Sequence, residues 1–420
     1  MINSGDTAWV LASGALVLFM TPGLAIFYGG MVRAKSALNM MMMSFAAIGV
    51  TTIIWVLYGY SLTFGKSHNG LIGGFEHIGL AKTLDEVVGA EGHQIPTLAF
   101  AMFQLTFAII TVALLSGAIA DRAKYGSWVL FVAVWITLVY IPVAHWAFAS
   151  QSGTGGWIVD KLGALDFAGG TVVEINSGAA ALALALVLGK RDGFKKDPMR
   201  PHNMPLVLLG AGMLWFGWFG FNAGSALSAG SLAATAMINT QIASAAASMS
   251  WALYEKWRDG KATTLGVASG AVAGAVVITP ACGFINPMGA LILGLIAGVA
   301  SSYAVSRKYK FGYDDSLDVV GVHGVCGIIG MLGIGVLATV TVNAPGKNGL
   351  FSNGGTTLLT HQLIAVVSVA LFSFCATWLI AKAITLTIGF RVFKDDELTG
   401  LDTVYHAESA YDISGNSNRY

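Results

Sequence analysis

Two ionisable side chains lie inside long apolar stretches of this sequence. Glu174 is in the run GGTVVEINSGAAALALALVLG, residues 169–189, and His323 is in DVVGVHGVCGIIG, residues 318–330. A charged side chain at the centre of a membrane helix costs about 2.5–3.5 kcal/mol on insertion scales, so such residues usually line a pathway and pair with one another. We therefore predict that Glu174 and His323 are partners that line a pathway through the membrane. The alternative is a buried ion pair with a purely structural role.

The elements that must position this pair are membrane helices. Charged residues make up 11% of the 420 residues, against about 25% in soluble domains, and hydrophobic residues make up 55%. A membrane-spanning helix needs about 20 apolar residues. The sequence predicts an all-α polytopic membrane protein with eleven transmembrane helices, at residues 8–30, 38–64, 97–119, 126–148, 168–189, 204–226, 232–254, 264–283, 287–306, 319–342 and 357–388.

The lysines and arginines predict the orientation of these spans. Of the 23, 18 lie in alternate connections and in the C-terminal tail, four lie in the connections on the opposite side, and Lys382 lies within the last span. Cytoplasmic loops carry the excess of positive charge in membrane proteins. We therefore expect the N-terminus outside the cell and the tail, residues 391–420, in the cytoplasm.

The first ten spans divide into two sets of five, residues 8–189 and 204–342. Because five is odd, the two sets have opposite topology, and inverted repeats of this kind place a transport site near the midplane, at their interface. Aligning Glu174 with His323 also sets Gly178 opposite Gly327. We expect a membrane domain at residues 1–390, with the last helix at 357–388, followed by a regulatory tail.

Several long motifs resemble those of the ammonium transporter family (Amt/MEP/Rh), from about Gly5 to residue 411. They are MTPGLAIFYGGMVR, MFQLTFAIITVALLSGAIADR, YIPVAHW, GALDFAGGTVVEINSG, GWFGFNAGSAL, ITPACGFI, GVHGVCGIIG and GLDTVYHAESAY. The resemblance implies a homotrimer in the cell membrane, with eleven helices and one pore per subunit. It implies transport of ammonium or ammonia, no cofactor and no enzymatic activity.

The resemblance also assigns roles to single residues. Phe103 and Phe107 are four residues apart and share a helix face. Aromatic faces attract cations that have lost water. The expected ammonium-binding residues are Phe103, Phe107, Phe148 and Ser225, the expected gate is Phe107 with Phe221, the expected proton relay is Glu174 with His323, and Asp166 is expected to give electrostatic and structural support.

Two of these positions depart from the common pattern of the family. Phe148 stands where Trp is frequent, and Trp is the stronger partner for a cation. Trp146, two residues away, faces elsewhere on a straight helix, so we do not expect it to compensate. Glu174 stands where most bacterial relatives have a histidine, an arrangement that resembles fungal members. A carboxyl and an imidazole in contact titrate as a unit.

Other polar residues receive simpler interpretations. The histidines and acids of loop 65–96 are expected to be solvated and not to bind a metal, because their spacing does not fit a metal site. His145 and His361 are expected to reach the surface at span ends, and Asn222 and Asp318 to join or cap helices. Nothing in the charge pattern indicates nucleic-acid binding.

Three readings of the function remain open. The first is an ammonium transporter that moves the proton through the Glu174–His323 pair. The second is an ammonium sensor that reports binding through its tail, and the third is a channel for neutral NH3. Whether a PII-type signalling protein binds the tail is left open.

Overall fold

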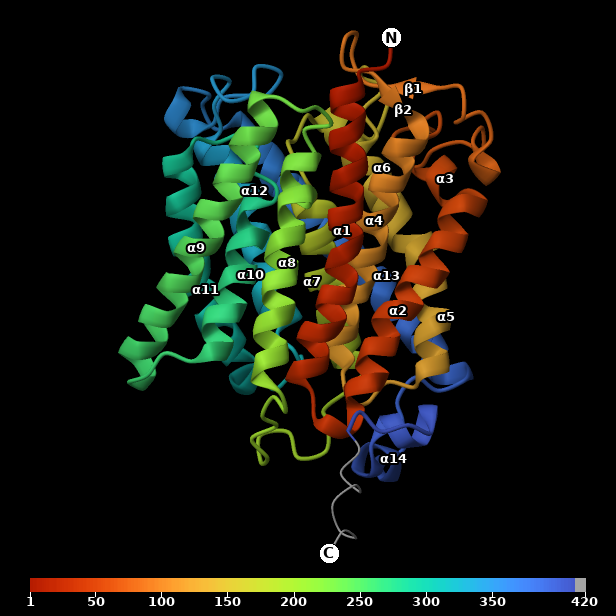
Figure 1. Ribbon diagram of the computed structural model, residues 1–420, viewed down its shortest axis with the longest axis vertical. Helices are drawn as coiled ribbons and strands as arrows, with labels where there is room; N and C mark the ends of the chain where they lie inside the picture. The colour runs from red at the N-terminus through yellow and green to blue at the C-terminus, as the bar shows by residue number, and fades with distance from the viewer. Residues whose placement is uncertain (412–420) are drawn as a thin grey trace, which may run out of the picture.

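The computed structural model describes residues 1–411, and residues 412–420 of the predicted tail, with Arg419, lie outside the described part. Most helices run side by side along the long axis of the molecule (Figure 1). Within residues 1–411 the helices of eleven or more residues are α1 (Ser4–Met31), α2 (Ala37–Ile54), α4 (Thr97–Leu115), α5 (Tyr125–Trp135), α7 (Asn176–Leu188), α8 (Met204–Gly224), α9 (Ser231–Asp259), α10 (Thr264–Ile278), α11 (Pro287–Phe311), α12 (Val325–Leu337) and α13 (Thr357–Thr387).

Shorter segments extend or connect these helices. The α-helical ones are α3 (Tyr60–Phe64), α6 (Ile141–Phe148) and α14 (Lys394–Thr399), and the strands are β1 (Val87–Val88) and β2 (Ile95–Pro96). The π-helical ones are η2 (Trp55–Gly59), η5 (Ile136–Tyr140), η6 (Trp157–Leu162), η7 (Gly170–Ile175), η8 (Val320–Gly324) and η10 (Asp402–His406). The 3-10 turns are η1 (Ala34–Ser36), η3 (Ile78–Leu80), η4 (Ser116–Ile119) and η9 (Leu350–Ser352).

The predicted membrane spans correspond to helices of the structure. Among residues 1–411, nine helices are long and apolar enough to cross a membrane. The other two predicted spans fall on α10, which has 15 residues, and on α9, whose many Ser, Thr and Asn residues lower its hydropathy. The multi-pass helical architecture is therefore confirmed, and the count of eleven spans stays a prediction.

The two ends of the helical bundle are different. The N-terminus and the antiparallel pair β1–β2 lie at one end, here called the outer end, and α14 lies at the other, the inner end (Figure 1). The backbone N–H of Asn3 donates to the carbonyl of Gln94 at 2.8 Å, which ties the N-terminus to the outer strands. The chain therefore begins and ends at opposite ends of the bundle. This arrangement requires an odd number of membrane crossings, as predicted.

The first helices of the two predicted repeats pack together along their length. α1 lies against α8 (Figure 1), and glycines allow the close approach. A Cβ on Gly210 would lie 2.4 Å from the backbone nitrogen of Phe27. Small residues at such contacts are typical of helix packing in membranes, where van der Waals contact replaces the hydrophobic effect.

The expectation for His145 is wrong. Its side chain is fully buried near the outer end of α6 rather than reaching the surface. Nδ1 lies 2.7 Å from the carbonyl oxygen of Thr63, and Nε2 lies 2.8 Å from the hydroxyl of Ser67. Both ring nitrogens are therefore satisfied inside the protein, and His145 joins α6 to the start of loop 65–96.

Candidate functional site

A cavity of about 560 Å³ opens at the outer end of the bundle. Phe148, Asp166 and Ser225 line it, as the sequence predicted for an outer binding site. The other lining residues are Tyr60, Phe64, His77, Glu86, Val87, Val88, Thr97, Phe100, Gln104, Ala147, Ala149, Ser150, Gln151, Val159, Phe167 and Leu227. Three of the predicted site residues thus meet from α6, from the loop before η7 and from the end of α8.

Buried aromatic rings lie next to this cavity, in contact with Phe148, but Phe103, Phe107 and Phe221 are not among the residues that line it. The ring centroids of Phe107 and Phe221 are 4.2 Å apart with an interplanar angle of 32°. Phe103 lies edge-on to Phe107 at 4.8 Å, and Phe148 lies edge-on to it at 6.4 Å. Phe103, Phe107 and Phe221 are each 1% exposed, so the rings block the way inward.

Ser225 lies at the end of the same helix as Phe221. Its hydroxyl donates to the carbonyl oxygen of Phe221 at 2.8 Å. A hydroxyl has one proton to donate and two lone pairs that accept. Because the proton is used within the helix, the hydroxyl presents only acceptor capacity to a ligand, which suits a cation that carries only donors.

A second, narrow cavity begins directly beneath the aromatic rings. Its volume is about 10 Å³, close to the minimum that holds one water molecule. Phe221 lines it at the outer side, and Glu174 and His323 line it together with Met20, Leu24, Phe27, Ile110, Leu114, Val173, Leu214, Trp218 and Val272. Apart from the pair, the wall is almost entirely apolar.

Glu174 and His323 contact each other within this narrow passage. His323 Nδ1 lies 2.7 Å from Glu174 Oε2, and the two side chains are only 5% and 1% exposed. Within residues 1–411 the second carboxyl oxygen, Oε1, has no hydrogen-bond partner. A buried acceptor without a donor is costly. This arrangement leaves room for a hydrogen bond from a molecule in the passage.

Two wide helical turns place the pair. η7 contains Glu174 and η8 contains His323, and each is followed directly by an α-helix, α7 or α12. Wide turns of this kind occur mostly as single turns within helices and are frequent at functional sites. The fifth and tenth predicted spans therefore begin in the same way, with the ionisable residue inside the wide turn.

The contact between these two spans is reciprocal. A Cβ on Gly178 would lie 2.2 Å from the Cα of Gly324, next to His323. A Cβ on Gly327 would lie 2.8 Å from the Cβ of Glu174. Each glycine lets the opposite wide turn approach, and this mutual approach brings the two side chains within hydrogen-bond distance.

Asp166 organises the start of η7. Oδ1 accepts from the backbone nitrogens of Gly169 and Gly170 at 2.8 and 2.7 Å, and Oδ2 accepts from the backbone nitrogen and the hydroxyl of Thr171 at 2.7 and 2.5 Å. These donors would otherwise be unpaired at a helix start. The carboxylate also lines the outer cavity, so it adds negative charge there.

The passage continues from the pair toward the inner end. His323 also lines a further cavity of about 10 Å³, together with Met31 and Leu317. Met31 and Leu317 in turn line a wider cavity of about 190 Å³. Lys308 and Asp318 line this wider cavity and are bonded through Nζ and Oδ1 at 2.5 Å. Asp318, which was expected to join or cap helices, thus forms an ion pair with Lys308. The pair lines the wider cavity, here called the inner opening.

Trp146 does not reach the outer site. Its ring packs 4.7 Å from that of Phe372 and 5.8 Å from that of Trp157, and its indole nitrogen donates to the carbonyl of Leu71. The expectation that Trp146 faces elsewhere is confirmed. Asn222 donates to the hydroxyl of Thr240 at 2.9 Å and so joins α8 to α9, as expected.

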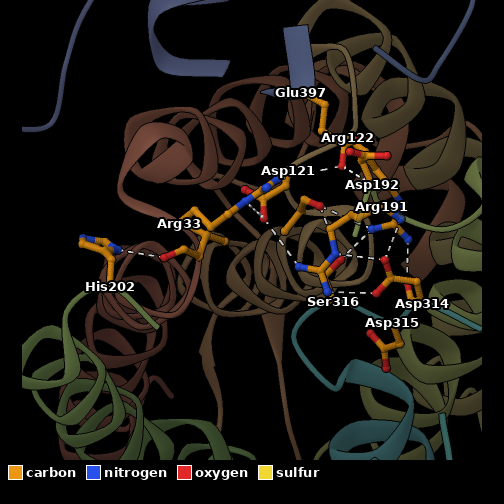
Figure 2. Close-up of polar contacts among 12 residues, drawn as sticks. Arg33, Asp121, Arg122, Arg191, Asp192, His202, Asp314, Asp315, Ser316 and Glu397 are labelled. Carbon is orange, nitrogen blue, oxygen red and sulfur yellow. Dashed lines mark hydrogen bonds and ion pairs between the residues drawn. The ribbon is translucent and has the colours of Figure 1, made fainter. Parts of the chain in front are cut away.

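A buried ionic network that sequence reasoning missed lies at the inner end (Figure 2). Arg191 Nε and Nη2 each donate to Asp314 at 2.9 Å, and Arg33 Nε donates to Asp121 at 3.2 Å. Burial raises the pKa of Asp314, but the bonds from Arg191 and the charge of Arg122 outweigh it and hold the pKa below its usual value. The network joins four loops that are far apart in the sequence, because Arg191 also donates to Asp121 at 3.5 Å.

For two other groups at this end, burial outweighs the compensating charges and hydrogen bonds. Burial lowers the pKa of Arg122 to about 10 and raises the pKa of Asp315 to about 6. Arg122 donates to the hydroxyl of Ser316 at 2.5 Å (Figure 2). The charged residues are visible in the sequence, but the bonded partners named here lie 88 to 194 positions apart and could not be identified from it.

The first part of the tail is attached to this network. Glu397 is 1% exposed and accepts from the backbone nitrogen of Asp192 at 2.8 Å and from Arg391 at 3.0 Å. Asp402 accepts from the backbone nitrogens of Leu38 and Asn39 at 3.0 and 2.8 Å, which caps the start of α2. The tail thus contacts the connection between α7 and α8 and the start of α2 at the inner end.

Comparison with known proteins identifies the family. Residues 8–411 match the model of the Ammonium Transporter Family. The chain is 51% identical to an ammonium transporter of Mycobacterium tuberculosis over 98% of this chain and 91% of the relative. It is 45% identical to ammonium transporter Amt1 of Archaeoglobus fulgidus over 98% of this chain and the whole of that protein.

Solved structures agree with this result. The crystal structure of Saccharomyces cerevisiae Mep2 superposes with a TM-score of 0.85 at 32% identity, over 94% of this chain and 88% of Mep2. A protein described as a sensor Amt protein superposes with a TM-score of 0.87 at 28% identity, over 96% and 98% of the two chains. This chain, with its aromatic constriction above a buried carboxyl–imidazole pair, belongs to the ammonium transporter family.

Proposed function

We propose that this protein carries ammonium across the membrane along the passage from the outer cavity to the inner opening. The observation that supports this most directly is the Glu174–His323 contact of 2.7 Å beside a cavity of about 10 Å³. Ammonium is a small cation with four donors and no acceptor. The groups along the path are aromatic faces, a hydroxyl acceptor and a proton-accepting pair, which match that chemistry.

The outer steps use Ser225 and the aromatic rings. Ammonium that enters the outer cavity donates to the Ser225 hydroxyl and lies against Phe148 and Phe107, where cation–π attraction contributes about 0.5–2 kcal/mol for each ring. Phe107 and Phe221 then act as the gate. Because Phe148 attracts a cation less strongly than Trp, affinity at this site depends more on Ser225 and on negative charge from Asp166.

The inner steps separate ammonia from its proton. The apolar wall below the gate disfavours a charged ion, so NH4⁺ gives up a proton as it passes. Glu174 and His323 share one hydrogen bond and can take up and release that proton as a unit. NH3 then moves through the narrow passage, and the proton follows through the pair to the inner opening.

The test is ammonium-evoked current across a membrane that contains the purified protein, measured at several pH values. A transporter that moves the proton with each ammonia carries a current that changes with pH. A channel for neutral NH3 carries no current, so its absence, combined with ammonia flux into vesicles, would favour that alternative.

We further propose that the protein forms a homotrimer in the cell membrane with its N-terminus outside. The charge bias along the sequence supports this orientation. Protease added outside intact cells is expected to leave the tail uncut, and protease added to inverted vesicles is expected to cleave it at its exposed cations, such as Lys394. Cleavage at Lys394 from outside intact cells would show the opposite orientation.

We also propose that the tail regulates transport through its contact with α2. Replacing Asp402 with Ala removes the cap on Leu38 and Asn39, and such a loss costs about 1 kcal/mol, which weakens docking about fivefold. We expect reduced current with the assembled trimer intact. Deletion from Phe393 onward is expected to give a stronger reduction.

The matched control is Asp395→Ala, which removes an exposed carboxylate on α14. Wild-type current in Asp402→Ala and in the deletion would contradict regulation by the tail. The same inner face is the surface at which a PII-type signalling protein would bind, and co-purification with the intact chain, but not with the deletion, tests that partner.

A further inference from the structure

The outer cavity extends beyond the predicted ammonium site toward the loop of residues 65–96. Glu86 and His77, both from this loop, line the cavity together with the rings of Tyr60, Phe64 and Phe100. The sequence-based expectation that the ionisable residues of this loop are merely solvated is therefore incomplete. Two of them lie where an ion entering from outside passes.

Local contacts hold this end of the cavity in shape. The carbonyl of Glu86 accepts from the backbone nitrogen of Thr97 at 3.0 Å, just before β1. The backbone nitrogen of His77 donates to the hydroxyl of Ser61 at 2.9 Å. Phe64 lies edge-on to Phe100 with ring centroids 4.8 Å apart. The loop is thus joined to α3 and α4, which form the cavity wall.

The side chains here offer acceptors and aromatic faces. The Glu86 carboxylate is 43% exposed and lies 3.7 Å from His77 Nδ1. That nitrogen is also 3.2 Å from the carbonyl oxygen of Ala81, which can only accept, so Nδ1 carries the proton. The His77 ring lies 5.9 Å from that of Tyr60.

Gln104 connects this end of the cavity with the gate. It is one helical turn from both Phe100 and Phe107 on α4 and lines the same cavity. It is only 8% exposed, and its Oε1 has no partner in the described part of the chain. A buried amide oxygen without a donor is costly, and because Gln104 also lines the cavity, a ligand there that carries N–H donors can satisfy it.

We propose that this end of the cavity is a second ammonium site, in which Glu86 attracts the cation from the outer solution and Gln104 receives it on the way to Ser225. The proposal rests on the proposed transport function and adds an entry site to it. The ligand is a small cation with several N–H donors, because the wall combines a carboxylate, an unpaired amide oxygen and three aromatic rings.

This placement determines which kinetic quantity the site controls. The carboxylate is 43% exposed and lines the outer cavity, whereas the Glu174–His323 pair lines the narrow one. Its charge therefore raises the local concentration of ammonium rather than the rate of the inner steps. Its attraction acts through water, so salt screens it; the screening length is about 30 Å at 0.01 M and about 8 Å at 0.15 M ionic strength. The effect is therefore largest at low salt.

The test compares Glu86→Gln with Asp85→Asn in membranes that contain the full chain. Asp85 is the neighbouring exposed carboxylate, and it does not line the cavity. At low ionic strength we expect Glu86→Gln to raise the KM for ammonium about fivefold and to leave the maximal current unchanged. The factor corresponds to about 1 kcal/mol, the attraction between two unit charges about 4 Å apart in water. At 0.15 M salt the difference should shrink, and Asp85→Asn should behave as wild type.

A second variant tests the link to the gate. Gln104→Leu removes the unpaired acceptor and should also raise the KM for ammonium. In the variant that combines Glu86→Gln with Gln104→Leu, the rise in KM should be smaller than the product of the two single effects, because both groups act on one ion. Equal KM values for wild type, Glu86→Gln and Asp85→Asn at low salt would overturn the entry site. So would a lower maximal current in Glu86→Gln without a change in KM.

These outcomes are separate from failure of the transport proposal. If wild-type protein gives no ammonium-evoked current at any pH, the proposed function fails. If wild type conducts normally and Glu86→Gln is indistinguishable from it at low salt, only the entry site fails.

Discussion

Glu174→Gln is expected to lower the ammonium-evoked current at least tenfold while the protein still folds and assembles. Gln has nearly the same size as Glu, and its side-chain oxygen can still accept a hydrogen bond from His323 Nδ1 at the observed 2.7 Å. It cannot take up a proton, however. A side chain positioned for general acid–base work raises the rate of a proton transfer about 10²–10⁴-fold. If the pair carries the proton, the loss of Glu174 should therefore cause a large drop in current.

Two further variants separate proton transfer from structure. Glu174→His restores an ionisable pair and should keep current, with a changed pH dependence or a changed selectivity against other cations. Glu174→Leu removes one member of a buried pair. Leaving the other member charged would lower the free energy of unfolding by about 3–5 kcal/mol, but a neutral His323 should avoid most of this loss. Thermal unfolding of all three variants measures the structural cost directly.

The outcome that contradicts this role is simple to recognise. Glu174→Gln with wild-type current at every pH would make Glu174 a structural group of the passage wall. The proton would then require another route, and the neutral-NH3 channel would become the better description if vesicle flux of ammonia persisted.

Gly178→Ala is expected to abolish current and to destabilise the protein by about 1–3 kcal/mol, the usual range for overpacking. The new Cβ would lie 2.2 Å from the Cα of Gly324 and 2.5 Å from its backbone nitrogen, and neither neighbour is a flexible side chain that can move away. The two spans must therefore separate. That separation moves His323 away from Glu174, and a hydrogen bond of 2.7 Å does not survive a shift of an ångström.

Gly212→Ala on α8 is the matched control, because its Cβ would meet nothing within 4 Å. It should leave both current and stability nearly unchanged. Current is measured per assembled protein, so that a lower yield of Gly178→Ala does not mimic a lower rate. Wild-type current in Gly178→Ala would show that the close approach of η7 and η8 is not needed for transport.

Much of this architecture could be predicted because it depends on local sequence. A span is recognised from about 20 consecutive apolar residues, so the predicted helix boundaries were close to those of the structure. The alternation of positive charge predicts the orientation of the spans. The span at 232–254 was also predicted, although α9 is less apolar than the others because polar side chains such as Asn239 face neighbouring segments and donate there, to the carbonyls of Cys282 and Ile285. Its hydropathy therefore understates its helical continuity.

The sequence also indicated which side chains matter. An ionisable residue in an apolar run is costly, so Glu174 and His323 stood out without any coordinates. The motifs added Phe107, Phe221 and Ser225 through resemblance. Their roles in transport remain predictions that the variants above test.

Only the tertiary structure decided which residues meet. Glu174 and His323 are 149 positions apart, and their contact depends on the mutual approach of two glycines, which no local pattern reveals. Burial of His145, the position of Glu86 in the outer cavity and the Arg191–Asp314 pair depend in the same way on chain segments brought together by packing. Hydropathy and helix periodicity are properties of neighbouring residues, whereas a site is formed by distances between remote ones.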